Sequence, residues 1–193
     1  MKATAIILAA GESKRMGVPK ALLEAEPGLT FLARLAKTFA DAGCAPLVVV
    51  GAHASEIQAG HPELPSVLNA GWAEGQLSSV YVGLRAALLQ GARWILIQPV
   101  DTPMIFPSTA AHLLAALAHA PALICACEGK TGHPLGLDAA AARTMLASPA
   151  KTLEDGARLL GAHRLPVDDP GILDNLNTPE AYRLRFGHNP RGV

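Results

Sequence analysis

Two small residues and three cations lie within ten residues of one another near the start of the chain, and together they could bind phosphate. Gly11 and Ser13 are followed by Lys14, Arg15 and Lys20. Glycine lets the backbone approach an anion closely, Arg15 offers a planar fork to phosphate oxygens, and Lys20 offers a point charge on a flexible stem. The segment matches neither the G-x-x-x-x-G-K-[ST] phosphate loop nor the G-x-G-x-x-G dinucleotide fingerprint. We therefore expect a phosphate-binding loop of another kind.

The segment before this loop predicts how it is positioned. Residues 5–10 form an apolar run without a charge, which is typical of a strand buried on both faces of a parallel sheet. Ligands of open parallel sheets bind beyond the carboxyl ends of the strands. The first strand should therefore deliver the loop to the place where a ligand is expected.

Strands and helices alternate along the rest of the chain. Further strands are expected at residues 46–51, 66–69, 94–98, 122–127 and 172–177. Helices are expected at residues 30–42, 53–59, 78–90, 107–119, 138–146 and 153–161, and from 178 onward. Ser78 or Ser79 would cap the third of these helices. This alternation implies an α/β protein with a mostly parallel central sheet covered by helices on both faces.

The domain organisation follows from the same pattern. We expect a single domain over residues 1–187 and a loose tail over residues 188–193, because the sequence shows no internal repeat or linker. Residues 128–170 interrupt the alternation of strands and helices. We expect them to cover the ligand cleft on the side where an acceptor substrate would bind.

Composition and charge exclude several classes of protein. The 193 residues carry 16 Lys+Arg and 16 Asp+Glu, and this balance argues against a nucleic-acid-binding protein and against a polybasic membrane anchor. The sequence shows neither a signal-peptide core nor an unbroken apolar run of about 18 residues. Cys44, Cys125 and Cys127 cannot all pair, and we expect ordinary core cysteines. A cytoplasmic location is therefore expected.

The segment from Leu8 to Lys20 reads L-A-A-G-x-S-x-R-M-G-x-P-K, and it resembles the signature of the nucleotidyltransferases related to the molybdenum cofactor cytidylyl- and guanylyltransferases. In that family the loop wraps the nucleoside triphosphate. The resemblance extends from Ile6 to about Tyr182 and implies a Rossmann-like, three-layer nucleotidyltransferase fold. It implies nucleotide binding by Leu8, Ala9, Ala10, Gly11, Ser13, Arg15 and Lys20.

Two oxygen-bearing side chains are candidate ligands of Mg²⁺. Asp101 follows the buried run 94–98, where a carboxylate suits a Mg²⁺ ion that bridges phosphates; otherwise it caps the following turn. The resembling family uses the Asp of a D-x-P pattern for the metal. The segment D-N-L-N-T-P-E resembles the family's C-terminal element, which implies Asn177 as the second ligand. Asn175 is the alternative ligand or a contact to the acceptor, and both asparagines could instead serve only as helix caps.

Two further segments resemble substrate-binding elements of the family. Residues 69–80 resemble the element that contacts the base and the ribose, in which Gly75 fits a close backbone approach. Ser79 either hydrogen-bonds the base or caps its helix. Gln76 replaces the usual methionine, so this element does not predict which base is bound. The element G-H-P resembles the cytidylyl branch, and its His133 either contacts the acceptor or is merely solvated.

These observations predict a Mg²⁺-dependent nucleotidyltransferase. A phosphate oxygen of the acceptor would attack the α-phosphorus of a nucleoside triphosphate, and pyrophosphate would leave. Arg15 would bind the β- and γ-phosphates, Lys20 would stabilise charge on the α-phosphate, and Asp101 and Asn177 would hold the metal. The catalytic residues are therefore expected to be Arg15, Lys20 and Asp101.

The resemblance also suggests the substrates and leaves alternatives open. The A-A-G loop and the G-H-P element favour CTP as donor and molybdopterin as acceptor, with a molybdoenzyme or a cofactor-insertion protein as partner. The guanylyl branch more often shows A-G-G at the loop. A guanylyltransferase of the same cofactor, a sugar- or polyol-phosphate nucleotidyltransferase and a non-catalytic nucleotide- or cofactor-binding chaperone remain alternatives.

Overall fold

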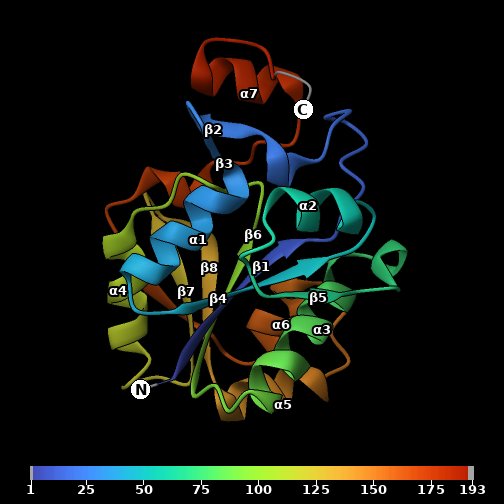
Figure 1. Ribbon diagram of the computed structural model, residues 1–193. Coiled ribbons are helices and arrows are strands. Elements are labelled where there is room, and N and C mark those ends of the chain that lie inside the picture. The colour runs from blue at the N-terminus through green and yellow to red at the C-terminus, as the bar shows by residue number, and fades with distance from the viewer. Residues whose placement is uncertain (1, 191–193) are drawn as a thin grey trace.

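The first apolar run forms the centre of a seven-stranded sheet in the computed structural model, which describes residues 2–190 (Figure 1). Strand β1 (Ala3–Ala9) is buried along its whole length. It pairs in parallel with β4 (Ala45–Val50) on one side and with β6 (Trp94–Pro99) on the other, and β5 (Ser66–Leu68) continues the parallel arrangement beyond β4. The carboxyl ends of β1, β4 and β6 therefore meet at one edge of the sheet.

The other half of the sheet is mixed. Strand β8 (Lys130–Asp138) lies antiparallel between β6 and β7 (Ala122–Cys127), and β9 (His163–Pro166) pairs in parallel with β7. The strand order is β5-β4-β1-β6-β8-β7-β9. A separate hairpin joins β2 (Glu24–Glu26) to β3 (Leu29–Thr30). The sheet is thus mostly parallel, as expected, but β8 runs against its neighbours.

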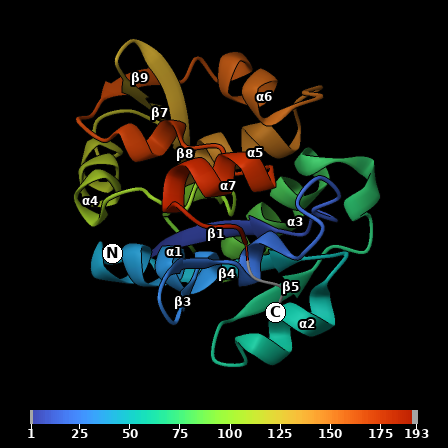
Figure 2. The same cartoon turned by 90° about the horizontal axis from the view of Figure 1, so that it is seen from above.

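Successive residues of β1 point to opposite faces of the sheet, and both sets are apolar. Helices therefore cover both faces (Figure 2). Ala5, Ile7 and Ala9 enter one apolar cluster, whereas Ile6 and Leu8 enter the other. The first face is covered by α1 (Phe31–Asp41), α2 (Ala54–Gly60) and α4 (Pro107–Ala116). The second face is covered by α3 (Gln76–Leu89), α5 (Ala139–Leu146) and α6 (Leu153–Leu159). This is the expected three-layer α/β/α architecture.

The last helix, α7 (Pro179–Phe186), packs on the first face through its aromatic side chains. The ring of Tyr182 stacks on Phe31 with a centroid distance of 6.0 Å, and the Tyr182 hydroxyl donates a hydrogen bond to the carbonyl of Glu24. These contacts fix the position of α7, whose capping residue Thr178 directly follows Asn177.

Two local predictions were wrong. Residues 172–177 were expected to be a strand, but Pro170–Leu173 form a 3₁₀ helix and residues 174–177 are irregular. The side chain of Asp169 accepts a hydrogen bond from Gly171 N and caps this turn. Helix α3 begins at Gln76 after Gly75, so neither predicted serine caps it; Ser78 Oγ instead donates to the carbonyl of Gly75.

Residues 128–170 are part of the sheet and its covering layer. They contribute β8 and β9 to the sheet and α5 and α6 to the second face. Their role on the acceptor side remains a prediction. Of the expected tail, residues 188–190 follow α7, and residues 191–193 lie outside the described part of the chain.

All three cysteines are buried and free. Burial raises the pKa of the Cys44 thiol to about 11. Burial and the negative charge of Asp169 together raise the pKa of the Cys125 thiol to about 12. They are core residues, as expected. None of the helices within residues 2–190 is long and apolar enough to cross a membrane.

Candidate functional site

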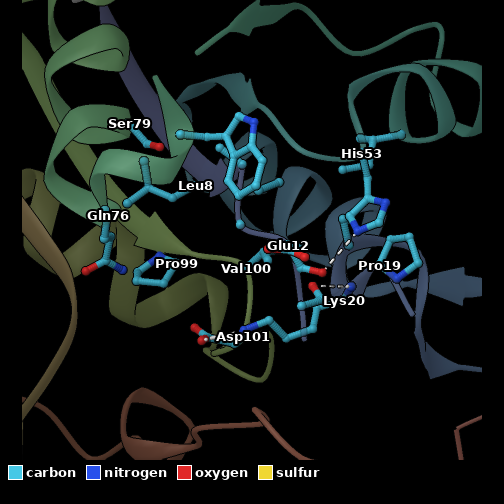
Figure 3. A pocket seen from close by; sticks show the side chains of 18 of the residues that line it. Leu8, Glu12, Pro19, Lys20, His53, Gln76, Ser79, Pro99, Val100 and Asp101 are labelled. Carbon is cyan, nitrogen blue, oxygen red and sulfur yellow. Dashed lines mark hydrogen bonds and ion pairs between the residues drawn. The ribbon is translucent and has the colours of Figure 1, made fainter. Parts of the chain in front are cut away.

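A cleft of about 290 Å³ opens at the carboxyl ends of β1 and β6 (Figure 3). Its walls come from the end of β1 and the loop after it, the residues before α2, the start of α3 and the end of β6. Many of the residues predicted to bind nucleotide line it: Leu8, Ala9, Ala10, Gly11, Ser13, Lys20, Gly75 and Ser79. Asp101 lines the cleft as well.

Ser13 shapes the loop that follows β1. Its φ of 56° is in the left-handed region, which side chains other than glycine seldom adopt. The Ser13 carbonyl accepts hydrogen bonds from Met16 N at 2.9 Å and Gly17 N at 3.0 Å, and its Oγ accepts one from Lys20 N at 3.2 Å. The loop therefore closes on Ser13, which brings Lys20 back toward the end of β1.

The Lys20 ammonium contacts both candidate metal ligands. Its Nζ lies 3.1 Å from Asp101 Oδ2 and also donates a hydrogen bond to Asn177 Oδ1. The side chains of Lys20 and Asp101 are only 16% and 20% exposed, so water screens this ion pair less than it would screen a surface pair. Three residues from distant parts of the sequence thus meet at one point of the cleft edge.

The backbone holds Asn177 next to Asp101. Leu176 N donates a hydrogen bond of 2.8 Å to the carbonyl of Asp101, and Thr178 caps α7 by accepting a bond from Ala181 N. The Asn177 amide group donates to Asn175 Oδ1. Asn175 is exposed, and in this arrangement it orients Asn177.

The chemistry of this cluster fits a divalent cation. Mg²⁺ prefers hard oxygen ligands and commonly takes one or two from the protein, with water and substrate phosphates completing its shell. Asp101 and Asn177 supply two such oxygens, and both already contact the same ammonium nitrogen. Among residues 2–190 no group of three His, Cys, Asp or Glu side chains forms a metal site. Water and nucleotide phosphates would supply the further ligands of a metal held here.

At the opposite end of the cleft, Asn69 organises the start of α3. Its Nδ2 donates to Ser78 Oγ at 2.8 Å and to Ser79 Oγ at 2.9 Å, and its Oδ1 accepts from Gly71 N at 3.0 Å. Ser79 is only 4% exposed, so its hydroxyl is held by the protein at the cleft floor. Gln76, at the start of α3, is exposed and labelled at the cleft in Figure 3.

Gly51 allows the end of β4 to approach the loop. A Cβ at this position would lie 2.6 Å from the carbonyl oxygen of Ala10 and 2.8 Å from Trp72 Cβ, so a larger residue would push these groups apart. Ala52 N donates a 3.0 Å hydrogen bond to the same Ala10 carbonyl. Trp72 and Pro99 add apolar surface to the cleft.

Four predicted site residues are not among those that line the cleft: Arg15, His133, Asn175 and Asn177. Arg15 is exposed at the loop, and within residues 2–190 its side chain forms no hydrogen bond or ion pair. His133 is half-buried on β8, and its buried Nδ1 has no hydrogen-bond partner among the described residues. Burial lowers the pKa of His133 below its usual value, although the negative charge of Asp101 raises it. His133 is therefore a neutral imidazole near Asp101 at neutral pH.

The residues that line the cleft but were not predicted as site residues include His53, Trp72 and Pro99. Trp72 lies within the predicted base-binding element, and Pro99 ends the strand before Asp101. His53 follows the predicted strand 46–51, so the rule that ligands bind beyond the carboxyl ends of parallel strands could have identified it.

A phosphate-type loop opposite a carboxylate, at the carboxyl ends of parallel strands, defines a nucleotide-binding α/β protein. The family model of the MobA-like NTP transferase domain matches residues 5–167. The chain belongs to this family.

Two similar sequences have different named activities, and a similar solved structure has the same fold. A probable molybdenum cofactor guanylyltransferase of Opitutus terrae is 36% identical over 99 residues, which is 51% of this chain and 48% of the relative; the chain thus matches about half the length of that protein. The nicotine blue oxidoreductase of Paenarthrobacter nicotinovorans is 34% identical over 149 residues, or 70% and 71% of the two chains. A nucleotidyl transferase structure from Methanothermobacter thermautotroptrophicus has a TM-score of 0.80 at 25% identity and covers 95% of this chain and 96% of its own.

Proposed function

We propose that this protein transfers a nucleoside monophosphate from a nucleoside triphosphate to a phosphorylated acceptor and releases pyrophosphate. The observation that carries the proposal is the meeting of Lys20, Asp101 and Asn177 at the edge of the cleft. A cation and two oxygen ligands at this point suit a reaction in which negative charge moves between phosphates.

The chemical step needs no side-chain nucleophile. A phosphate oxygen of the acceptor attacks the α-phosphorus in line, the new P–O bond forms, and the bond to the leaving pyrophosphate breaks. Lys20 stabilises negative charge on the α-phosphate, and Arg15, exposed at the loop, is placed to close on the β- and γ-phosphates. Mg²⁺ held by Asp101 and Asn177 would supply charge neutralisation to the phosphates when bound.

The donor base is proposed as cytosine or guanine. Ala10 in the loop and the G-H-P element favour CTP by resemblance to the cytidylyl branch. The relative from Opitutus terrae is named a guanylyltransferase, which supports GTP at least equally. The base-binding end of the cleft offers Ser79 and Gln76 as polar groups, and either base could hydrogen-bond to them.

Molybdopterin is the proposed acceptor, again by way of the named relatives. The acceptor would lie on the side of Asp101 that faces His133 and Asn175. A molybdoenzyme or a cofactor-insertion protein would then receive the product. A cytoplasmic location, expected from the sequence, is part of this proposal.

The relation to a nicotine blue oxidoreductase supports a second candidate function, an oxidoreductase that acts on an organic substrate. This match covers more of both chains than the match to the Opitutus terrae protein does. The two functions make different demands on the site, since nucleotidyl transfer requires the metal-ligand pair and hydride transfer does not.

Calorimetric titration with CTP, GTP, ATP and UTP, each with and without Mg²⁺, tests the proposal. Binding of CTP or GTP that tightens with Mg²⁺ supports it and names the donor. Absence of binding of all four triphosphates, together with reduction of a coloured substrate by a nicotinamide cofactor, would favour the oxidoreductase instead.

A further inference from the structure

His53 links two elements at the edge of the cleft. Its Nε2 lies 3.1 Å from the carbonyl oxygen of Glu12 in the loop after β1, and its Nδ1 lies 2.7 Å from Glu56 Oε2 on α2 (Figure 3 shows the bond to Glu12). The side chain is 25% exposed and lines the cleft. The ring therefore joins the loop to the helix that begins directly after it.

Both partners of this ring can only accept hydrogen bonds. A carbonyl oxygen and an ionised carboxylate have no proton to give, whereas a neutral imidazole carries a single N–H. Both contacts are hydrogen bonds at once only when His53 carries protons on both nitrogens. The bond to the Glu12 carbonyl needs a proton on Nε2, because the carbonyl oxygen can only accept.

His53 holds the peptide between Glu12 and Ser13, which belongs to the proposed phosphate-binding loop. Within a trans peptide the C=O and the next N–H point in opposite directions, so fixing the Glu12 carbonyl also fixes the direction of the Ser13 N–H. Ser13 is the residue with the left-handed backbone on which the loop closes. The Glu12 side chain is paired with the exposed Lys14, and such a surface pair holds a loop weakly.

We propose that His53 is a positioning residue for nucleotide binding: its Nε2–H fixes the Glu12–Ser13 peptide and so keeps the loop in the shape that receives the triphosphate. The inference rests on the proposed function and adds a residue to it. His53 acts through the loop and lies apart from Lys20 and Asp101, so it should influence binding more than the chemical step.

The test compares two histidines of the same helix. His53→Gln removes the ring beside the loop. His61→Gln is the matched control, because His61 ends α2 and contacts Thr30 at 2.9 Å and Glu63 at 3.4 Å, away from the loop. We expect His53→Gln to raise the dissociation constant and the KM for the triphosphate about tenfold, as for the loss of one hydrogen bond, and to leave kcat within about twofold. His61→Gln should leave both constants unchanged.

A second variant keeps the inference testable if His53→Gln does not fold. Glu56→Ala removes the other anchor of the ring at an exposed position and should raise the dissociation constant in the same direction. The ¹⁵N spectrum of the wild-type ring in the triphosphate complex should show a protonated Nε2 for His53.

The outcomes separate this inference from the proposed function. Triphosphate binding as tight in His53→Gln and Glu56→Ala as in the wild type overturns the role of His53. A His53 ring without a proton on Nε2 in the complex overturns it too, as does a loss confined to kcat. Failure of the wild-type protein to bind any triphosphate would overturn the proposed function, and with it the premise of this inference.

Discussion

Lys20 and Asp101 are 81 residues apart in the sequence, yet Lys20 Nζ lies 3.1 Å from Asp101 Oδ2. The contact exists because β1 and β6 are parallel neighbours, so the segments that follow them emerge at the same edge of the sheet. Asn177 joins the pair through the backbone bond between Leu176 N and the Asp101 carbonyl. The proposed chemistry depends on this convergence.

Loss of the Lys20 ammonium should remove a preorganised cation from the transition state. We expect Lys20→Ala to lower kcat by at least about a hundredfold, or about 3 kcal/mol, and Arg15→Ala to act in the same direction. Lys14→Ala is the matched control, because Lys14 is an exposed loop lysine paired only with Glu12, and its loss should cost little. Circular dichroism should show all three variants folded. Near-normal turnover in both Lys20→Ala and Arg15→Ala would remove their assigned roles.

Lys20 and a divalent cation compete for the same two oxygens in the absence of nucleotide. Asp101→Asn keeps the shape of the side chain but loses its negative charge. We expect it to abolish the Mg²⁺-dependent part of triphosphate binding. Lys20→Met should bind Mg²⁺ alone at least as tightly as the wild type, because the competing ammonium is gone. Calorimetric titration with the triphosphate, with and without Mg²⁺, measures the first effect, and titration with Mg²⁺ alone measures the second. Unchanged Mg²⁺ dependence in Asp101→Asn would exclude this aspartate as a ligand.

Gly132 packs against the segment that leads to Asn177. A Cβ at Gly132 would lie 2.2 Å from the carbonyl oxygen of Ile172, and a backbone atom cannot move aside as a side-chain end can. We expect Gly132→Ala to lower the free energy of unfolding by about 1–3 kcal/mol and to reduce turnover by displacing Asn177. Denaturant unfolding measures the first effect.

Gly60→Ala provides the control for this substitution. A Cβ there would meet only Leu22 Cδ2, at 3.2 Å, and alanine suits a helix better than glycine does. Its free energy of unfolding should be unchanged or higher. Equal stability of the two variants would contradict the packing argument for Gly132.

His133 should make stability depend on pH. Burial lowers its pKa in the folded protein below the ordinary value of 6.5, so the unfolded chain binds the proton more readily than the native protein does. Its contribution to stability is therefore present above about pH 6.5 and is lost as the pH falls through the folded-state pKa. We expect His133→Gln to lose less stability than the wild type between pH 7 and about pH 5. Parallel unfolding curves for the two proteins over this range would contradict the prediction.

Local signals in the sequence predicted much of the fold. Continuous apolar runs identified β1, β4 and β6, and the family resemblance pointed to part of the cleft lining, above all the loop after β1. Thr30 and Thr152 cap their helices through side-chain bonds to Ala33 N and Asp155 N, as residues of these types commonly do. These elements are decided within a few residues, so sequence patterns are sufficient for them.

Elements that depend on distant neighbours could not be predicted in the same way. Strand β8 contains Gly132, Pro134 and Gly136, which usually mark loops, and it is a strand because it fills the space between β6 and β7. A Cβ at Gly136 would lie 3.0 Å from the Leu113 side chain, so packing by α4 favours glycine there. The segment 172–177 begins inside a 3₁₀ helix that Asp169, a residue before the segment, caps through its bond from Gly171 N.

Pyrophosphate release is the measurement that tests the central claim most directly. Purified protein would be supplied with Mg²⁺, molybdopterin and either CTP or GTP, and pyrophosphate would be followed in the wild type and in Lys20→Ala. We predict acceptor-dependent release from one of the two triphosphates in the wild type and a loss of at least about a hundredfold in Lys20→Ala. Equal release by both proteins, or none from the wild type with either donor, would contradict the account.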